Sequence, residues 1–114
     1  MKRGLRLSQS ADVKGVRRKG RAHAHPFVVL FEAANGLDKS RIAVSAGKGV
    51  GNAVQRNRAK RVLKAAISPL AEQLEPGYDI LLQARVGIRP AKSADVQTAL
   101  KELLRKARLL RKNR

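Results

Sequence analysis

The segment 51–64 joins a glycine turn to a helical pattern whose basic side chains share one side. An α-helix advances about 100° per residue, so with Arg56 at zero the other polar side chains of that side fall between about 40° and 140°. They are Lys60, Lys64, Asn57 and Arg61. The opposite side is apolar, formed by Val62, Ala66, Ala59, Leu70 and Leu63. Such a helix is suited to holding the phosphate backbone of a nucleic acid.

These cations have no acidic neighbours along the chain. No Asp or Glu occurs between Asp38 and Glu72, whereas an ordinary surface helix carries glutamates that pair with basic residues four positions away. Arg58, at about 200°, lies at the edge of the polar side, and Ile67, at about 20°, interrupts its other boundary. A merely solvated basic face is the alternative interpretation. We favour an external anionic partner.

The glycines at positions 47, 49 and 51 precede this helix. A glycine-rich turn can hold phosphate through backbone amides and the positive end of the helix. Their spacing matches neither the Walker motif nor the dinucleotide-binding fingerprint, so a nucleotide site is not expected. Two interpretations remain: a tight turn alone, or a turn that also sets Lys48 and the helix start near an RNA phosphate. We favour the second.

Catalysis by protein groups has little support in the sequence. The 8 carboxylates are scattered, so no cluster suggests a two-metal nuclease, and no Ser/His/Asp set stands out. Asp79 opens an apolar strand, where a capping or salt-bridge role is expected. His23 and His25 share one side of an extended segment but lack the further ligands of a metal site. We expect both to be exposed near the nucleic acid.

The composition points to the same kind of partner. Lys and Arg number 26 against 8 acidic residues, which gives a net charge of +18 on 114 residues. A charge this high predicts an anionic partner, with nucleic acid first and a membrane surface second. The apolar stretches are too short to span a bilayer, and no secretory leader is visible. Without cysteine there is no disulfide, thiol nucleophile or zinc knuckle, and the cytoplasm is the default location.

The elements that must position the basic helix follow from the hydrophobic pattern. Before the glycine turn we predict a helix over 10–19, ended by Gly20, and strands over 27–31 and 41–45. Asn35-Gly36 offers a turn between these strands, which predicts an antiparallel hairpin. In the first strand we expect Phe27 in the core and Phe31 on an open sheet face, where it could stack on a base.

The second half alternates helix, strand and helix. The basic helix should continue toward Leu74 with a break or restart at Pro69, followed by a strand over 78–84 and a loop over 90–93. A final helix carries an apolar stripe from Val96 to Leu110 and turns its cations outward, namely Lys101, Arg105, Arg108 and Lys112. The fold class is therefore α+β: one RNA-binding domain over 1–114, a sandwich in the order α-β-β-β-α-β-α, with 1–8 and 111–114 disordered.

The ordered run 47–64 resembles the signature of the bacterial ribonuclease P protein subunit. The signature has a lysine, then Gly51-Asn-Ala-Val, then Arg56-Asn-Arg, with Lys-Arg two residues on. Weaker similarity covers most of the chain in the family's order. The resemblance implies a fold shared with a small-subunit ribosomal protein domain and a domain of elongation factor G. It also implies a left-handed crossover around the signature helix, against the general right-handed preference.

The resemblance also implies a function. The family provides the protein subunit of a ribonucleoprotein endonuclease that removes the 5′ leader of precursor tRNA, with one protein per RNA. The RNA subunit is the catalyst and holds the Mg²⁺ that activates water for in-line attack. The residues carried over to RNA binding are Lys48, Arg56, Asn57, Arg58, Lys60, Arg61 and Lys64, and Asn57 could also order a metal-bound water.

A leader-binding cleft is implied at Val13, Arg17 and Phe31. The family usually carries aromatic residues at the positions of Val13 and Arg17, so aliphatic and electrostatic contacts replace stacking here. Gly49 is a second departure, because a lysine is common at that position. Two rival functions remain: a ribosomal or ribosome-assembly protein, and a stand-alone basic nuclease whose activity would need one of the carboxylates.

Overall fold

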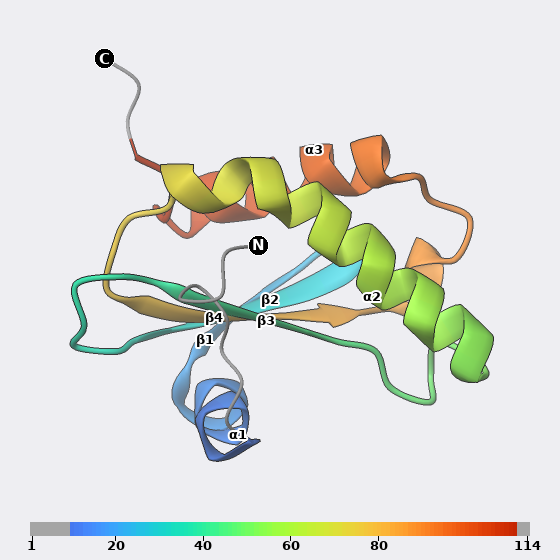
Figure 1. The fold of residues 1–114 in the computed structure, drawn as a ribbon, viewed down its shortest axis with the longest axis horizontal. Coiled ribbons are helices and arrows are strands. Elements are labelled where there is room, and N and C mark those ends of the chain that lie inside the picture. Colours follow the sequence, from blue (N-terminus) through green and yellow to red (C-terminus); the bar gives the residue numbers. More distant parts are fainter. Residues whose placement is uncertain (1–9, 112–114) are drawn as a thin grey trace.

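The computed structural model describes residues 10–111, and their side chains from Val13 onward. Three layers make up this part of the chain: α1 on one face of a four-stranded sheet, and α2 with α3 on the other (Figure 1). The helices are α1 (Ser10–Lys19), α2 (Ala53–Ile67) and α3 (Ser93–Lys106). The strands are β1 (Arg21–Ala24), β2 (Val28–Ala34), β3 (Arg41–Ser45) and β4 (Tyr78–Ala84). The predicted α+β class and element order are confirmed.

The sheet has the strand order β1-β2-β4-β3. β2 runs antiparallel to both β1 and β4, whereas β3 and β4 are parallel. The predicted hairpin between 27–31 and 41–45 is therefore wrong, because β4 lies between these two strands. The turn itself is present, with Gly36 at φ 70° and the Leu37 amide donating to Asn35 Oδ1. The chain between Ala34 and Arg41 is long enough to step past one strand, about 10 Å across two strand spacings.

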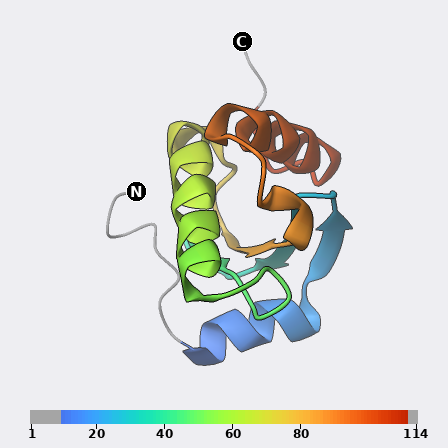
Figure 2. The same ribbon diagram turned by 90° about the vertical axis from the view of Figure 1, so that its right-hand side faces the viewer.

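The unit β3-α2-β4 is a parallel crossover, as the resemblance implies. α2 packs on β3 and β4 of the sheet and also against the neighbouring helix α3. Figure 2 shows α2 and α3 side by side above the sheet, with α1 below it. The left-handedness of the crossover remains an implication of the family. This arrangement presents the outer side of α2 to solvent.

The two faces of the sheet are packed differently. Alternate residues of each strand point to opposite faces, so the even-numbered residues of β2, β3 and β4 lie under α2 and α3. Five of their apolar side chains are fully buried in the main core: Val28, Leu30, Ile42, Ile80 and Leu82. On the α1 face, a small cluster has only Val16 and Leu81 buried among the described residues.

Several boundaries differ from the sequence prediction. α2 ends at Ile67, and Pro69 lies in the first turn of a 3₁₀ helix over Ser68–Gln73. A second 3₁₀ turn, Val86–Ile88, precedes the predicted loop. β1 was not located in the sequence, because four residues of mixed polarity carry no clear strand pattern.

The final helix ends at Lys106 rather than Leu110. Arg108 adopts φ 59°, the left-handed conformation that ends helices, and the Leu109 amide then donates to Leu104 O. The Arg111 amide donates to Gln73 O at 2.7 Å. The remaining residues predicted to be disordered, 1–8 and 112–114, lie outside the described range, as does Lys112.

Candidate nucleic-acid interface

The first turn of α2 is fixed by side chains that the signature supplies. Asn52 Oδ1 accepts from the Gln55 amide at 3.0 Å, and Gln55 Oε1 accepts from the Asn52 amide at 2.9 Å. This capping box satisfies two amides that a helix start leaves without partners. Gly51 adopts φ 145°, and a Cβ there would overlap the Gln55 side chain. The turn therefore requires glycine at this position.

α2 has the two sides that its sequence predicts. Ala59, Leu63, Ala66 and Ile67 are buried under the helix, so Ile67 belongs to the core rather than to the basic side. Asn57, Arg61 and Lys64 are exposed, and Arg56 and Lys60 are half-buried. Within residues 13–111, no ion pair or side-chain hydrogen bond engages the charged groups of Arg56, Lys60, Arg61 or Lys64. The basic side of α2 is thus free to bind an anion.

Arg58 differs from the other predicted contacts. Its guanidinium donates to Arg89 O at 2.8 Å and to Ala91 O at 3.1 Å. These bonds tie α2 to the segment before α3, in agreement with the position of Arg58 at the edge of the polar side. Its structural role is clear from the geometry, whereas its contact with RNA stays a prediction.

Lys48 lies in the turn that joins β3 to α2. The Val50 amide donates to Gly47 O at 3.1 Å and the Gly51 amide to Lys48 O at 3.2 Å, while Val50 is buried. Lys48 itself is exposed. The buried Val50 anchors the turn, so Lys48 is held close to the N-terminus of α2. Gly49 is exposed with open space around it, and a larger side chain would fit there.

The three predicted leader-binding residues lie on the α1 face of the sheet. Val16 fixes α1 on Leu81, and Val13 and Phe31 pack around that contact. Arg17, one helical turn after Val13, is exposed. Val13 and Arg17 on α1 and Phe31 on β2 form the predicted leader-binding surface, which is called the groove below. Phe27 packs against the main core, as predicted.

The α1 face of the sheet is partly polar beyond Phe31. Ser45 of β3 and Gln83 of β4 are paired in register on the same face as Phe31. Their Ser45 Oγ and Gln83 Oε1 atoms are buried without a hydrogen-bond partner in the part of the chain described. Sequence reasoning did not single out these residues. A glutamine inside the apolar run 78–84 was the signal that could have found one of them.

The buried carboxylate of Asp79, near the other end of the sheet, is paired with Arg41 and Asn35. Asp79 accepts two hydrogen bonds from Arg41, at 2.8 and 2.7 Å, and one from Asn35 Nδ2 at 2.9 Å. Burial opposes ionisation, but the hydrogen bonds from Arg41 and Asn35 and the charge of Arg41 outweigh it and lower the pKa of Asp79 from 3.8. The predicted salt-bridge role of Asp79 is confirmed.

The histidines are less exposed than predicted. His23 Nε2 lies 3.0 Å from Glu32 Oε2, a pairing that half-buries the imidazole on the cross-strand neighbour β2. His25 Nδ1 accepts from the Phe27 amide at 3.1 Å and its ring contacts the Phe27 ring. Both side chains therefore serve the local fold. No group of three His, Cys, Asp or Glu side chains that could hold a metal ion occurs among the described residues.

Known proteins resemble this chain in sequence and in fold. Residues 1–108 match the model of the Ribonuclease P family. The chain belongs to the ribonuclease P protein family. The ribonuclease P protein component of Herpetosiphon aurantiacus is 36% identical over 109 residues, which cover 96% of this chain and 89% of that protein. The component of Clostridioides difficile is 34% identical over 88% of this chain and 89% of that protein.

Solved structures of ribonuclease P proteins share the fold. The protein from Staphylococcus aureus gives a TM-score of 0.81 at 26% identity, covering 93% of this chain and 97% of that one. The protein from Thermotoga maritima gives 0.77 at 23% identity, covering 89% and 96%, and at that identity it supports the fold alone.

Membership of the ribonuclease P protein family makes this chain a protein component of the enzyme that processes the 5′ end of tRNA, and it implies an RNA partner. The ordered signature on α2 therefore belongs to a ribonuclease P protein. None of the described helices is long and apolar enough to cross a membrane.

Proposed function

We propose that the chain binds the catalytic RNA of ribonuclease P through the outer side of α2 and the 5′ leader of precursor tRNA through the groove beside α1. The observation that carries the proposal is the row of charged groups at Arg56, Lys60, Arg61 and Lys64, which have no acidic partner within the described residues. Asn57 and Lys48 extend this surface, and Arg58 borders it. One protein is assigned to each RNA, in the cytoplasm.

In this proposal the protein binds and the RNA subunit carries the chemistry. We assign the Mg²⁺, which would activate the attacking water, to phosphates of the RNA subunit. The cations of α2 reduce the repulsion between two polyanions, the catalytic RNA and the substrate. Asn57 is exposed one residue after Arg56. Its side-chain amide could donate a hydrogen bond to a metal-bound water or accept one from it.

The leader contact combines three kinds of side chain. Phe31 is half-buried on the sheet and offers an aromatic surface on which a base can stack, while Val13 adds apolar contact from α1. Arg17 supplies a charge for the leader phosphates. With one aromatic residue in the groove, the leader is held less by stacking and more by charge.

Cleavage of 5′-labelled precursor tRNA at low magnesium tests the cofactor role. A bacterial ribonuclease P RNA alone, the protein alone and the mixture should show accurate leader removal only in the mixture. Cleavage by the protein alone would make it a nuclease, and no stimulation of a well-matched RNA would favour a ribosomal role.

The salt dependence of RNA affinity tests the surface on α2. If about five phosphates are contacted, log affinity should fall with log salt at a slope of about −3.5 to −4.5. Replacing Arg56 and Arg61 by Ala should weaken binding and flatten this slope by about two units. Lys101→Ala with Arg105→Ala on α3 makes the same charge change elsewhere and is the matched control. An unchanged slope in the α2 variant would remove α2 from the interface.

A further inference from the structure

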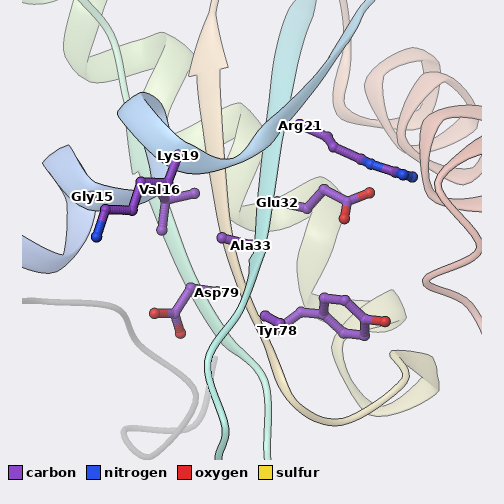
Figure 3. Close-up of a pocket in the computed structure, with 9 residues that line it drawn as sticks. Gly15, Val16, Lys19, Arg21, Glu32, Ala33, Tyr78 and Asp79 are labelled. Carbon is purple, nitrogen blue, oxygen red and sulfur yellow. The ribbon is translucent and has the colours of Figure 1, made fainter.

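A second recess lies on the side of α1 opposite to the groove. Its volume is ≈ 810 Å³, and Figure 3 shows its walls coming from α1, β1, β2 and β4. The lining residues are Gly15, Val16, Lys19, Arg21, Glu32, Ala33, Ala34, Tyr78 and Asp79. Val13 lies about 160° around α1 from Gly15, and Arg17 lies about 160° from Lys19. The predicted leader cleft therefore does not include this recess.

The recess forms where β2 continues past the end of β1. The last pair of the β1–β2 ladder is Arg21 with Glu32, so within residues 10–111 no strand pairs with that side of β2 at Ala33 and Ala34. Hydrogen-bonding groups alternate between the two sides of a strand. The Asn35 amide points toward β4, since it donates to Gly77 O. The Ala34 amide therefore points to the open side and provides a backbone donor in the recess.

Two cations belong to the lining of the same recess. Lys19 extends from the end of α1 on one side of β2, and Arg21 from the start of β1 on the other (Figure 3). Both side chains are exposed, and neither has a hydrogen bond or ion pair within residues 13–111. The two carboxylates of the lining are engaged, Asp79 by Arg41 and Glu32 by His23. When Arg41 is counted with its partner Asp79, three cationic groups face two carboxylates, so the recess carries a small net positive charge.

A half-buried aromatic ring completes the recess. Tyr78 is the partner of Ala34 in the β2–β4 register, and its ring lies beside Glu32 on the Arg21 side (Figure 3). A phenol ring can stack on a base and its hydroxyl can donate or accept a hydrogen bond. Backbone amides together with Lys and Arg are common phosphate ligands in RNA complexes. The recess thus offers phosphate ligands next to a surface for a base.

We propose that this recess binds one nucleotide of single-stranded RNA, with its phosphate at the Ala34 amide between Lys19 and Arg21 and its base against Tyr78. The proposal rests on the proposed function, since it gives RNA outside the leader groove a second point of attachment. Exposed cations at Lys14, Arg17 and Arg18 connect the groove to the recess over the outer side of α1. A leader long enough to cross α1 would reach it.

Titration of the ¹⁵N-labelled full chain with a dinucleoside monophosphate tests the site by NMR. We expect the Ala34 amide and the Tyr78 ring signals to shift together with a single affinity. Lys19→Gln with Arg21→Gln should weaken that affinity about tenfold, because two charge-assisted contacts are lost. Lys101→Gln with Arg105→Gln on α3 makes the same charge change and should leave the affinity within twofold.

Three results would overturn the assignment. One is that shifts occur only on α2 or in the groove, and another is that both double variants weaken binding equally. The third is that inorganic phosphate shifts the Ala34 amide with the same affinity as the dinucleoside monophosphate, and that neither ligand shifts the Tyr78 ring. The recess would then be an anion site only. Leader removal by the wild-type protein with ribonuclease P RNA tests the proposed function separately. If that cleavage occurs and one of these three results is found, the recess assignment alone fails.

Discussion

The two faces of the sheet carry the same strands but opposite kinds of surface. Under α2 and α3, residues such as Leu30, Ile80 and Leu82 are fully buried in one continuous core. Under α1, Val16 and Leu81 are buried, Phe31 remains half-exposed, and a recess opens where the edge of β2 meets α1. The comparison teaches that the two faces differ in packing: one is filled with side chains and supplies stability, and the other leaves accessible surface at which the leader contact is proposed.

The strongest way to break this division is a cavity in the filled face. Leu82→Ala removes a fully buried side chain from the centre of the main core, and it should lower the free energy of unfolding by about 2–5 kcal/mol. Chemical denaturation measures this loss. At a temperature where the variant remains folded, the salt slope of RNA binding should match that of the wild type. A changed slope would show that the core also sets the RNA contacts.

The ion pair on the α1 face gives a smaller and pH-dependent effect. Asp79→Asn removes the charge that Arg41 and Asn35 stabilise, and it should cost about 1–3 kcal/mol of unfolding free energy at neutral pH. Because the pKa of Asp79 is lowered by folding, this contribution is complete above the ordinary value of 3.8 and is lost as the pH falls below it. Denaturation of both proteins across the acid range measures it. A difference that stays constant into strong acid would contradict this origin.

The smallest effect on stability and a clear effect on binding are expected at Phe31. Phe31→Ala removes the aromatic surface of the groove, so leader affinity should fall by about 1–2 kcal/mol, while affinity for a tRNA without leader stays unchanged. Phe31→Leu keeps most of the apolar packing and separates stacking from burial. Competition between substrates with and without a leader measures the difference. Equal losses for both substrates would place Phe31 in the core rather than the interface.

Local sequence patterns predicted most of the helices and strands of this fold. The helical stripe of α2 and the apolar run 78–84 have strong periods, and both elements lie where those periods predict. The antiparallel hairpin failed because Asn35-Gly36 specifies only a local turn, whereas the neighbours of β2 depend on where β4 inserts. Local chemistry contains no information on that choice.

The candidate site shows the same limit. The basic side of α2 follows from the pattern of one helix and could be anticipated. The second role of Arg58, in contrast, depends on backbone carbonyls 31 and 33 residues away along the chain. The recess at Ala34 depends on where β1 happens to stop, and β1 has no clear sequence pattern. Contacts between distant segments therefore account for what the sequence did not reveal.

The central position of β4 has a consequence for synthesis of the chain on the ribosome. β2 and β3 emerge from the ribosome before β4. They do not pair with each other in the sheet, since each pairs with β4, so the pairing must wait for residues 78–84. α2 is translated before β4 and α3, which are the elements that its apolar side packs against. A nascent chain that ends before β4 accordingly has its cationic helix without a core, and native structure must await nearly the whole polypeptide.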